Sequence, residues 1–347
     1  MRLRLAYVLA VAVLIATGIA GGRLRAADGP YAKVGEIPIG GAGAFDYLTV
    51  DSPAKRLYVT HGAEIVVIDL STNKVVGRIP DTPRVHGIAI GPGDRGFTSN
   101  GGEDKVGIVD LKTLQTLSKI GTGKNPDAIL YEPKQQEVYA LNHTGESVTV
   151  INAANGSVVA TIPLAGTAET GQADPGLGRV FVNIEDKNSV DVIDVATHKV
   201  IANWPVAPAI SPTGMAIDTV GHRVIVGGGK FMVMIDASSG KVVATAPICT
   251  GTDATFFDPG TKLAFSSCSD GNITVVHQDS PGKLTVVQTL VTARGARTMA
   301  LDPATHRVYT VAQNFRPVDP AADPAAGRGR GPTPIPESFH VLIFGMQ

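Results

Sequence analysis

A repeat of about 42 residues constrains the fold of this chain more than any other feature of its sequence. Six apolar runs each end at a polar residue, and successive end residues lie 41, 42, 42, 42 and 41 positions apart: Asp69, Asp110, Asn152, Asp194, Asp236 and His277. A fixed period of roughly 40 to 45 residues is typical of chains that arrange copies of one supersecondary unit. The repeat therefore predicts an architecture of equivalent units.

Each repeat contains four short runs of strand-like composition separated by turn residues, supplied by 40 glycines and 23 prolines. In the third repeat the runs are Ala128–Tyr131, Val138–Leu141, Val148–Ile151 and Val158–Ile162. Four strands in a repeat of this length are typical of a β-propeller blade. About 295 residues remain without the N-terminal segment and a late insertion, enough for roughly seven repeats. We predict an all-β, seven-bladed β-propeller with four antiparallel strands per blade.

The two ends of the repeat array predict how the ring closes. The last repeat stops after its third strand, Phe339–Phe344. The segment Lys33–Pro38 has the same pattern as Lys74–Pro80, the fourth run of the first repeat. Pairing Lys33–Pro38 with the last repeat would cover an open sheet edge. We therefore expect a single propeller over residues 31–347, closed by an N-terminal strand that completes the last blade.

The N-terminal segment has the composition of an export signal. Arg2 and Arg4 precede the apolar run Leu5–Ala20, which is short for a membrane span but typical of a secretory signal. We predict a signal peptide at 1–26 and a periplasmic or secreted protein with no transmembrane segment after its removal; an uncleaved anchor is the alternative. The charged fraction of 18% and net charge of −1 argue against nucleic acid as a partner.

The repeat residues resemble a known family. The run Arg56–Thr60 (RLYVT), the Val-Ile-Asp hairpins and the 42-residue period are similar to the YVTN-repeat, or YncE-like, family of exported bacterial propellers. The resemblance covers essentially the whole mature chain and implies the seven-bladed fold and export. It implies no activity, because the repeat residues have packing and turn roles.

Superposition of the repeats predicts a ring of polar residues. In a propeller the first strand of each blade begins at one mouth of the central channel. The residues expected there all form hydrogen bonds, and four are charged: Tyr47, His86, Asp127, Glu169, Thr213, Asp253 and Arg297. The ends of the second strands should reach the same face, and they carry His61, Asn100, Asn142, Asn183 and Ser267. The sequence therefore predicts a polar channel mouth.

Several kinds of chemistry suit these residue types. Carboxylates with amide oxygens favour calcium or magnesium, which leads us to expect Asp127, Glu169 and Asp253 as ligands. His61 and His86 could instead help to bind a transition metal, or act as catalytic acid and base. Arg297 could hold an anionic group. The alternative is a hydrogen-bonded plug that only stabilises the channel.

The remaining histidines fall into two groups. His143 and His340 are placed where either could reach the mouth. Four others map to turns on the opposite face, where surface roles are expected: His198, His222, His277 and His306.

Two further features should lie on the mouth face. Residues 313–338 form an insertion rich in Pro, Ala and Gly between strands of the last blade, either a flap over the mouth or a tolerated loop. Cys249 and Cys268 are the two cysteines, and an even count in an exported chain permits a disulfide; two free thiols are the alternative.

Three functions remain open from the sequence. The first is binding of a small polar molecule or a divalent metal at the channel mouth. The second is a metal-dependent hydrolase or lyase, similar to a lactonase, that uses the same carboxylate, Asn and His residues. The third is a protein-interaction scaffold. The chain has no HExxH, GxSxG or phosphate-loop motif, so whether it is an enzyme stays open.

Overall fold

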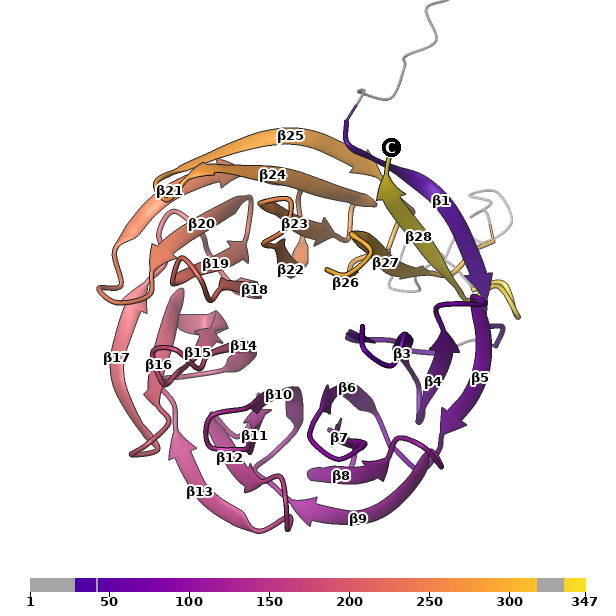
Figure 1. The fold of residues 1–347 in the computed structure, drawn as a ribbon, viewed down its shortest axis with the longest axis horizontal. Coiled ribbons are helices and arrows are strands. Elements are labelled where there is room, and N and C mark those ends of the chain that lie inside the picture. Colours follow the sequence, from indigo (N-terminus) through magenta and orange to yellow (C-terminus); the bar gives the residue numbers. More distant parts are fainter. Residues whose placement is uncertain (1–28, 42, 317–333) are drawn as a thin grey trace, which may run out of the picture.

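A computed structural model describes residues 29–41, 43–316 and 334–347. These residues form seven four-stranded antiparallel sheets arranged around a central channel (Figure 1). The seven-bladed, all-β fold is therefore confirmed. The predicted signal peptide lies outside the described residues, as do positions 317–333 of the insertion. Within the described ranges, no helix is both long and apolar enough to cross a membrane.

Within each blade the strands lie side by side, with the first-named strand nearest the channel and the last-named at the outer edge (Figure 1). The first three blades contain β2 (Leu48–Asp51), β3 (Arg56–His61), β4 (Glu64–Asp69) and β5 (Lys74–Ile79); β6 (Val85–Ile90), β7 (Arg95–Asn100), β8 (Lys105–Asp110) and β9 (Gln115–Gly121); and β10 (Pro126–Glu132), β11 (Glu137–Asn142), β12 (Ser147–Asn152) and β13 (Val158–Pro163).

The next three blades follow the same order. They contain β14 (Ala168–Asp174), β15 (Arg179–Ile184), the 3₁₀ turn η1 (Glu185–Lys187), β16 (Ser189–Asp194) and β17 (Lys199–Pro205); β18 (Pro212–Asp218), β19 (Arg223–Gly228), β20 (Phe231–Asp236) and β21 (Val242–Pro247); and β22 (Thr252–Asp258), β23 (Leu263–Cys268), β24 (Asn272–Ser280) and β25 (Lys283–Val291).

The seventh blade joins the two ends of the chain. It contains β26 (Met299–Asp302), β27 (Arg307–Ala312), β28 (His340–Met346) and β1 (Tyr31–Pro38). β1 pairs antiparallel with β28, with Ile37 opposite Val341, and runs along its outer edge in Figure 1. The predicted closure by an N-terminal strand is confirmed.

Packing between blades explains why the second and third strands are the most apolar. Both faces of these strands are covered by neighbouring blades, so β11 and β12 are almost entirely buried. An aromatic side chain sits in the second strand of six blades and is at most 1% exposed: Tyr58, Phe97, Tyr139, Phe181, Phe265 and Tyr309. Burying a side chain of this size contributes roughly 1.5–3 kcal/mol. The fourth strands face solvent, where Val158 and Val159 of β13 are about half exposed.

Candidate functional site

The innermost strands are irregular at the predicted ring positions. The pairing register with the second strand shifts in the blades that begin with β6, β10, β14, β18 and β22, and His86, Asp127, Glu169, Thr213 and Asp253 lie within those shifts. A β-bulge bends the strand and re-aims a side chain. Tyr47 and Arg297 instead precede the short strands β2 and β26. The ring is thus built mainly from bulges at the strand starts.

Asp46, His86 and Asp127 form the first cluster. The Nδ1 atom of His86 lies 2.6 Å from Oδ2 of Asp46 and 3.4 Å from Oδ1 of Asp127. His86 is 8% exposed and Asp127 9% exposed, so this cluster is largely shielded from solvent. One donor atom from each of the three residues lies within 4.8 Å of the others.

Asp127, His143 and Glu169 form a second cluster that meets the same distance limit. The Nδ1 atom of His143 lies 3.1 Å from Oε2 of Glu169 and 2.9 Å from the carbonyl oxygen of Ala168. Because Asp127 belongs to both clusters, the five residues form a chain in which carboxyl and imidazole groups alternate. This chain draws on the first four blades of the ring.

The pKa values of these groups reflect burial and mutual charge. Burial raises the pKa of Asp127 to about 7, although the charge of His86 opposes this shift. Burial alone would lower the pKa of His86, but the hydrogen bond with Asp46 and the charge of Asp127 outweigh it and raise the pKa. The hydrogen bond with Glu169 raises the pKa of His143 to about 9. The neighbouring carboxyl groups therefore favour the protonated form of both imidazoles.

The donor set of the first cluster fits a divalent metal ion. The buried Nε2 of His86 has no hydrogen-bond partner within the described ranges, and the same holds for Oδ1 of Asn125. Both atoms lie 2.6 Å from the place that a Cβ on Gly101 would occupy. If Nε2 carries the proton of a neutral ring, the Nδ1 lone pair is available to a metal ion beside the two carboxylates. Two carboxylate oxygens and one imidazole nitrogen are common ligands of divalent transition metals.

Tyr47 crosses the channel at the level of the ring. Its hydroxyl group lies 3.1 Å from Oγ1 of Thr170, which belongs to β14 three blades away. Next to Tyr47, a cavity of about 350 Å³ is lined mainly by inner-strand residues, among them Ile129, Met215 and Phe256. Tyr47 therefore closes part of the channel between the charged clusters and this cavity.

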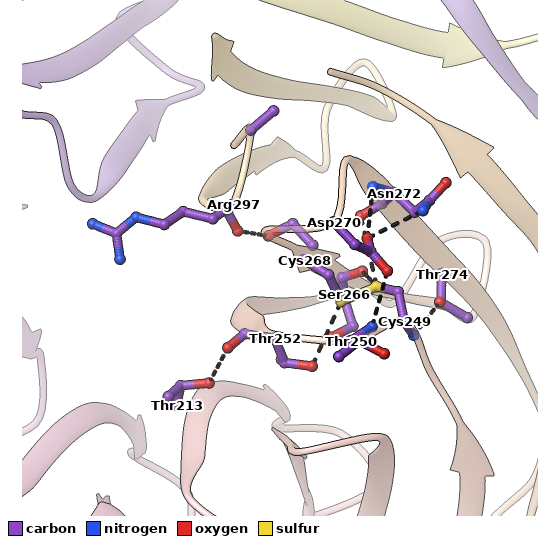
Figure 2. Close-up of a disulfide and its surroundings, with 12 residues drawn as sticks. Thr213, Cys249, Thr250, Thr252, Ser266, Cys268, Asp270, Asn272, Thr274 and Arg297 are labelled. Carbon is purple, nitrogen blue, oxygen red and sulfur yellow. Dashed lines mark hydrogen bonds between the residues drawn. A yellow bond between two sulfur atoms is a disulfide. The ribbon is translucent and has the colours of Figure 1, made fainter. Parts of the chain in front are cut away.

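Asp253, Arg297 and Thr213 complete the ring on its other side. Nη1 of Arg297 donates to Oδ1 of Asp253 at 2.9 Å, and Nη2 lies 4.0 Å from Oδ1 of Asp46. Burial raises the pKa of Asp253 to about 6, although the charge of Arg297 opposes the shift. Thr213 donates to the carbonyl of Thr252, as Figure 2 shows. These contacts pair Asp253 with a cation and keep it outside the two metal-compatible clusters.

The residues at the ends of the second strands form hydrogen bonds with nearby side chains and backbone. The amide nitrogens donate from Asn100 to Glu103, from Asn142 to Ser147 and Thr149, and from Asn183 to the carbonyl of Gly214. The Ser267 hydroxyl donates to the carbonyl of Arg297. The bonds of the three asparagines thus join strands or loops and do not reach the charged clusters.

His61 and His340 are not brought into the clusters. The His61 ring stacks on Phe339 with centroids 4.5 Å apart, and its Nδ1 lies 3.6 Å from Oε1 of Glu64. Nδ1 of His340 lies 2.7 Å from the carbonyl oxygen of Ser338. Of the histidines considered for the mouth, the structure therefore gathers His86 and His143.

Histidines near the first turn of a blade pair with acids of the preceding blade. Nδ1 of His222 lies 2.6 Å from Oδ2 of Asp174, and Nδ1 of His306 lies 2.6 Å from Oδ2 of Asp258. Both carboxylate side chains are fully buried. These two pairs join adjacent blades, a role beyond the surface role expected from the sequence.

Cys249 and Cys268 form a disulfide, with Cα atoms 5.9 Å apart (Figure 2). Cys249 lies in the loop after β21, and Cys268 ends β23 of the sixth blade. The backbone amide of Cys249 also donates to Oγ1 of Thr274. The disulfide therefore anchors the loop that leads into β22. This strand begins at Thr252, the residue before Asp253.

Sequence reasoning missed Asp46 and gave His143 only as a possible contributor. Asp46 directly precedes Tyr47, the residue that counting assigned to the first blade. The pairing of β2 with β3 has no register shift, unlike the inner strands of the next five blades. The sequence did show a carboxylate, Asp46, one position before Tyr47. Counting the same number of residues in every repeat missed it, because the first blade lacks the bulge that the next five blades have.

Comparisons with known proteins support the family resemblance over part of the chain. A segment of 121 residues is 31% identical to the uncharacterized protein YncE of Salmonella typhi and covers 33% of this chain and 34% of YncE. YncE of Salmonella typhimurium (strain LT2) matches to the same extent. The match thus spans about a third of the length of these relatives. No family model matches the chain.

Solved structures show the same fold at low sequence identity. The RRP9 WD40 repeats superpose with a TM-score of 0.74 at 12% identity, covering 92% of this chain and 99% of that one. A chain of Kuenenia stuttgartiensis hydrazine synthase gives a TM-score of 0.69 at 17% identity, covering 84% and 96%. At such identities the likeness concerns the fold alone. Together with the seven blades, the similarity to YncE supports assigning this chain to the YncE-like β-propellers.

Proposed function

We propose that this chain binds a divalent transition-metal ion at the channel mouth through Asp46, His86 and Asp127. The observation that carries the proposal is the position of the His86 Nδ1 atom, which faces two carboxylate oxygens at 2.6 and 3.4 Å. In the metal-free protein a proton occupies this position between negative charges. A metal ion would replace the proton, because ligands release protons when they bind a metal.

The donor types favour zinc or manganese over calcium. Calcium takes six to eight oxygen ligands, whereas imidazole nitrogen suits the transition metals. The short spacing of the donor atoms also favours an ion over an organic molecule at this position, since all three lie within 4.8 Å of one another. Tyr47 and the buried His86 leave little room for a larger group among these atoms.

Isothermal titration of the metal-free full chain with Zn²⁺ and Mn²⁺ tests this function. We expect saturable binding, with an affinity at least about 10-fold weaker in His86→Asn, since a lost ligand should cost at least as much as a lost outer-shell partner. His222→Asn is the matched control, because His222 also lies 2.6 Å from a buried aspartate but belongs to none of the metal-compatible groups found among the described residues. Absence of binding, or equal weakening in both variants, would contradict the proposal.

We also propose that the protein is exported. Two features support this: the basic and apolar N-terminal sequence, and the disulfide, since disulfides persist in oxidising compartments. Expression of the full chain in a bacterium, followed by fractionation and N-terminal sequencing, tests it. We expect a periplasmic or secreted product that begins near residue 27. A full-length product in the cytoplasm with two free thiols would refute export.

A further inference from the structure

We propose that the mouth holds two metal ions, with the Asp127 carboxylate bridging them. The first ion would occupy the Asp46–His86–Asp127 cluster and the second the Asp127–His143–Glu169 cluster. This inference rests on the proposed function, which requires only the first ion. It predicts a dinuclear centre built from the first four blades of the propeller.

The geometry of the two clusters carries this inference. Each offers three donor atoms within 4.8 Å of one another, and Asp127 is the residue they share. A carboxylate has two oxygens and about four lone-pair positions, so it can coordinate two ions. In two-metal sites the ions lie roughly 3.5–4 Å apart, a separation that one carboxylate can bridge.

The environment of Asp127 is the second observation. Its residue exposure is 9%, yet within the described ranges no group donates a hydrogen bond to its carboxylate; the His86 ring approaches to 3.4 Å without hydrogen-bond geometry. A buried carboxylate is costly unless a charge or hydrogen bond compensates it. Cations on both sides of Asp127 would supply that compensation.

The other members of the second cluster are positioned for an ion. Nδ1 of His143 lies 2.9 Å from the carbonyl oxygen of Ala168, which fixes Nδ1 as the protonated nitrogen in the neutral ring. An ion in this cluster would therefore have to bind Nε2 of His143, as in histidines that donate one ring N–H to a backbone carbonyl and bind a metal through the other nitrogen. Glu169 is 19% exposed at its side chain, so an ion can enter from the mouth.

The charge of the two clusters is compatible with a second ion. With both imidazoles neutral, the two clusters hold three carboxylates, and the Asp253 carboxylate nearby is balanced by Arg297. One divalent ion would leave one net negative charge buried among these groups. A second divalent ion compensates that charge and brings the net charge of the two clusters to +1.

Manganese stoichiometry of the metal-free full chain tests the inference. We expect two Mn²⁺ per chain by titration and metal analysis, and an exchange-coupled pair in the low-temperature electron paramagnetic resonance spectrum. Glu169→Gln should lower the stoichiometry to one and abolish the coupling. Glu185→Gln is the control and should keep both ions, because Glu185 borders Glu169 but belongs to neither cluster. Asp127→Asn should also lose the coupled signal.

The outcomes separate this inference from the proposed function. One uncoupled ion per chain, unaffected by Glu169→Gln, would overturn the dinuclear centre and leave the first site intact. No bound ion would overturn both. Thermal unfolding of each variant distinguishes a lost ligand from a lost fold, and Glu169→Gln is the decisive variant because this side chain is partly exposed. Equal loss of an ion in the Glu185→Gln control would also overturn the inference.

Discussion

Substitution of Gly101 by alanine should disturb the candidate metal site without removing any of its ligands. Gly101 directly follows β7 and has no side chain beside the His86 ring. A Cβ atom at this position would lie 2.6 Å from Nε2 of His86 and 2.6 Å from Oδ1 of Asn125. Ordinary contacts of a Cβ begin at 3.4 Å, so these atoms must move away by about 0.8 Å.

The imidazole has little space in which to move. On its far side Nδ1 already lies 2.6 Å from the Asp46 carboxylate, so displacement strains or breaks that hydrogen bond. Overpacking of this kind costs typically about 1–3 kcal/mol. Loss of the Asp46 contact should also return the pKa of His86 toward its ordinary range, because that hydrogen bond is the main influence that raises it.

Urea unfolding of the metal-free protein measures the first effect, and a pH titration of the imidazole followed by nuclear magnetic resonance measures the second. Gly121→Ala is the control, since a Cβ there meets no atom within 4 Å, and its effect should stay within about 1 kcal/mol. We expect Gly101→Ala to lose about 1–3 kcal/mol more than the control. Unchanged stability together with an unchanged His86 titration would refute the packing argument.

Two further predictions concern the disulfide and pH. Replacing Cys249 and Cys268 by serine should lower the free energy of unfolding by about 3 kcal/mol, because the 19-residue separation closes a loop in the unfolded chain; a denaturant midpoint equal to that of the oxidised protein would contradict this. In metal-free protein the pKa of His143 is raised to about 9, so its stabilising charge is fully present below about pH 6.5 and is lost as pH rises through 9. Because His143 is only half-buried and solvent screens the pair, Glu169→Gln should be destabilised relative to the natural chain by about 1 kcal/mol at pH 6, with a smaller difference at pH 10 in urea unfolding. A pH-independent difference would exclude the ion pair as its cause.

The architecture could be predicted because the repeat is carried by residues that packing constrains. The second and third strands are covered on both faces, so they read as continuous apolar runs such as Val138–Leu141 and Val148–Ile151, and the structure extends each by one residue at both ends. The turn residues recur for a local reason. Asp69, for example, accepts hydrogen bonds from the backbone amides of Ser71 and Thr72. Both signals are local, and a fixed period repeats them.

The site was less predictable because its geometry depends on strand irregularities that the period does not encode. Counting residues treats all first strands as equivalent, but the pairing of β2 with β3 lacks the register shift found in β6, β10 and β14. The side chain that reaches His86 in the first blade is therefore Asp46, one position earlier than the count predicts. His143 lies in a loop, where the repeat gives no register at all.

A ring of seven equivalent positions does not produce seven equivalent contributions, and the difference follows from which charges become neighbours. In the first four blades the imidazole of His86 lies between the carboxyl groups of Asp46 and Asp127. The imidazole of His143 is grouped with those of Asp127 and Glu169, so the shared Asp127 links all five residues into one chain. On the other side Asp253 meets Arg297, a permanent cation that competes with any metal for its carboxylate. Removing the cation from one side of the ring, or adding a cation to the other, should therefore change which carboxylates can bind a metal ion. Arg297→Gln should make Asp253 available as a ligand, whereas introducing an arginine at His143 should remove the second ion by pairing with Glu169.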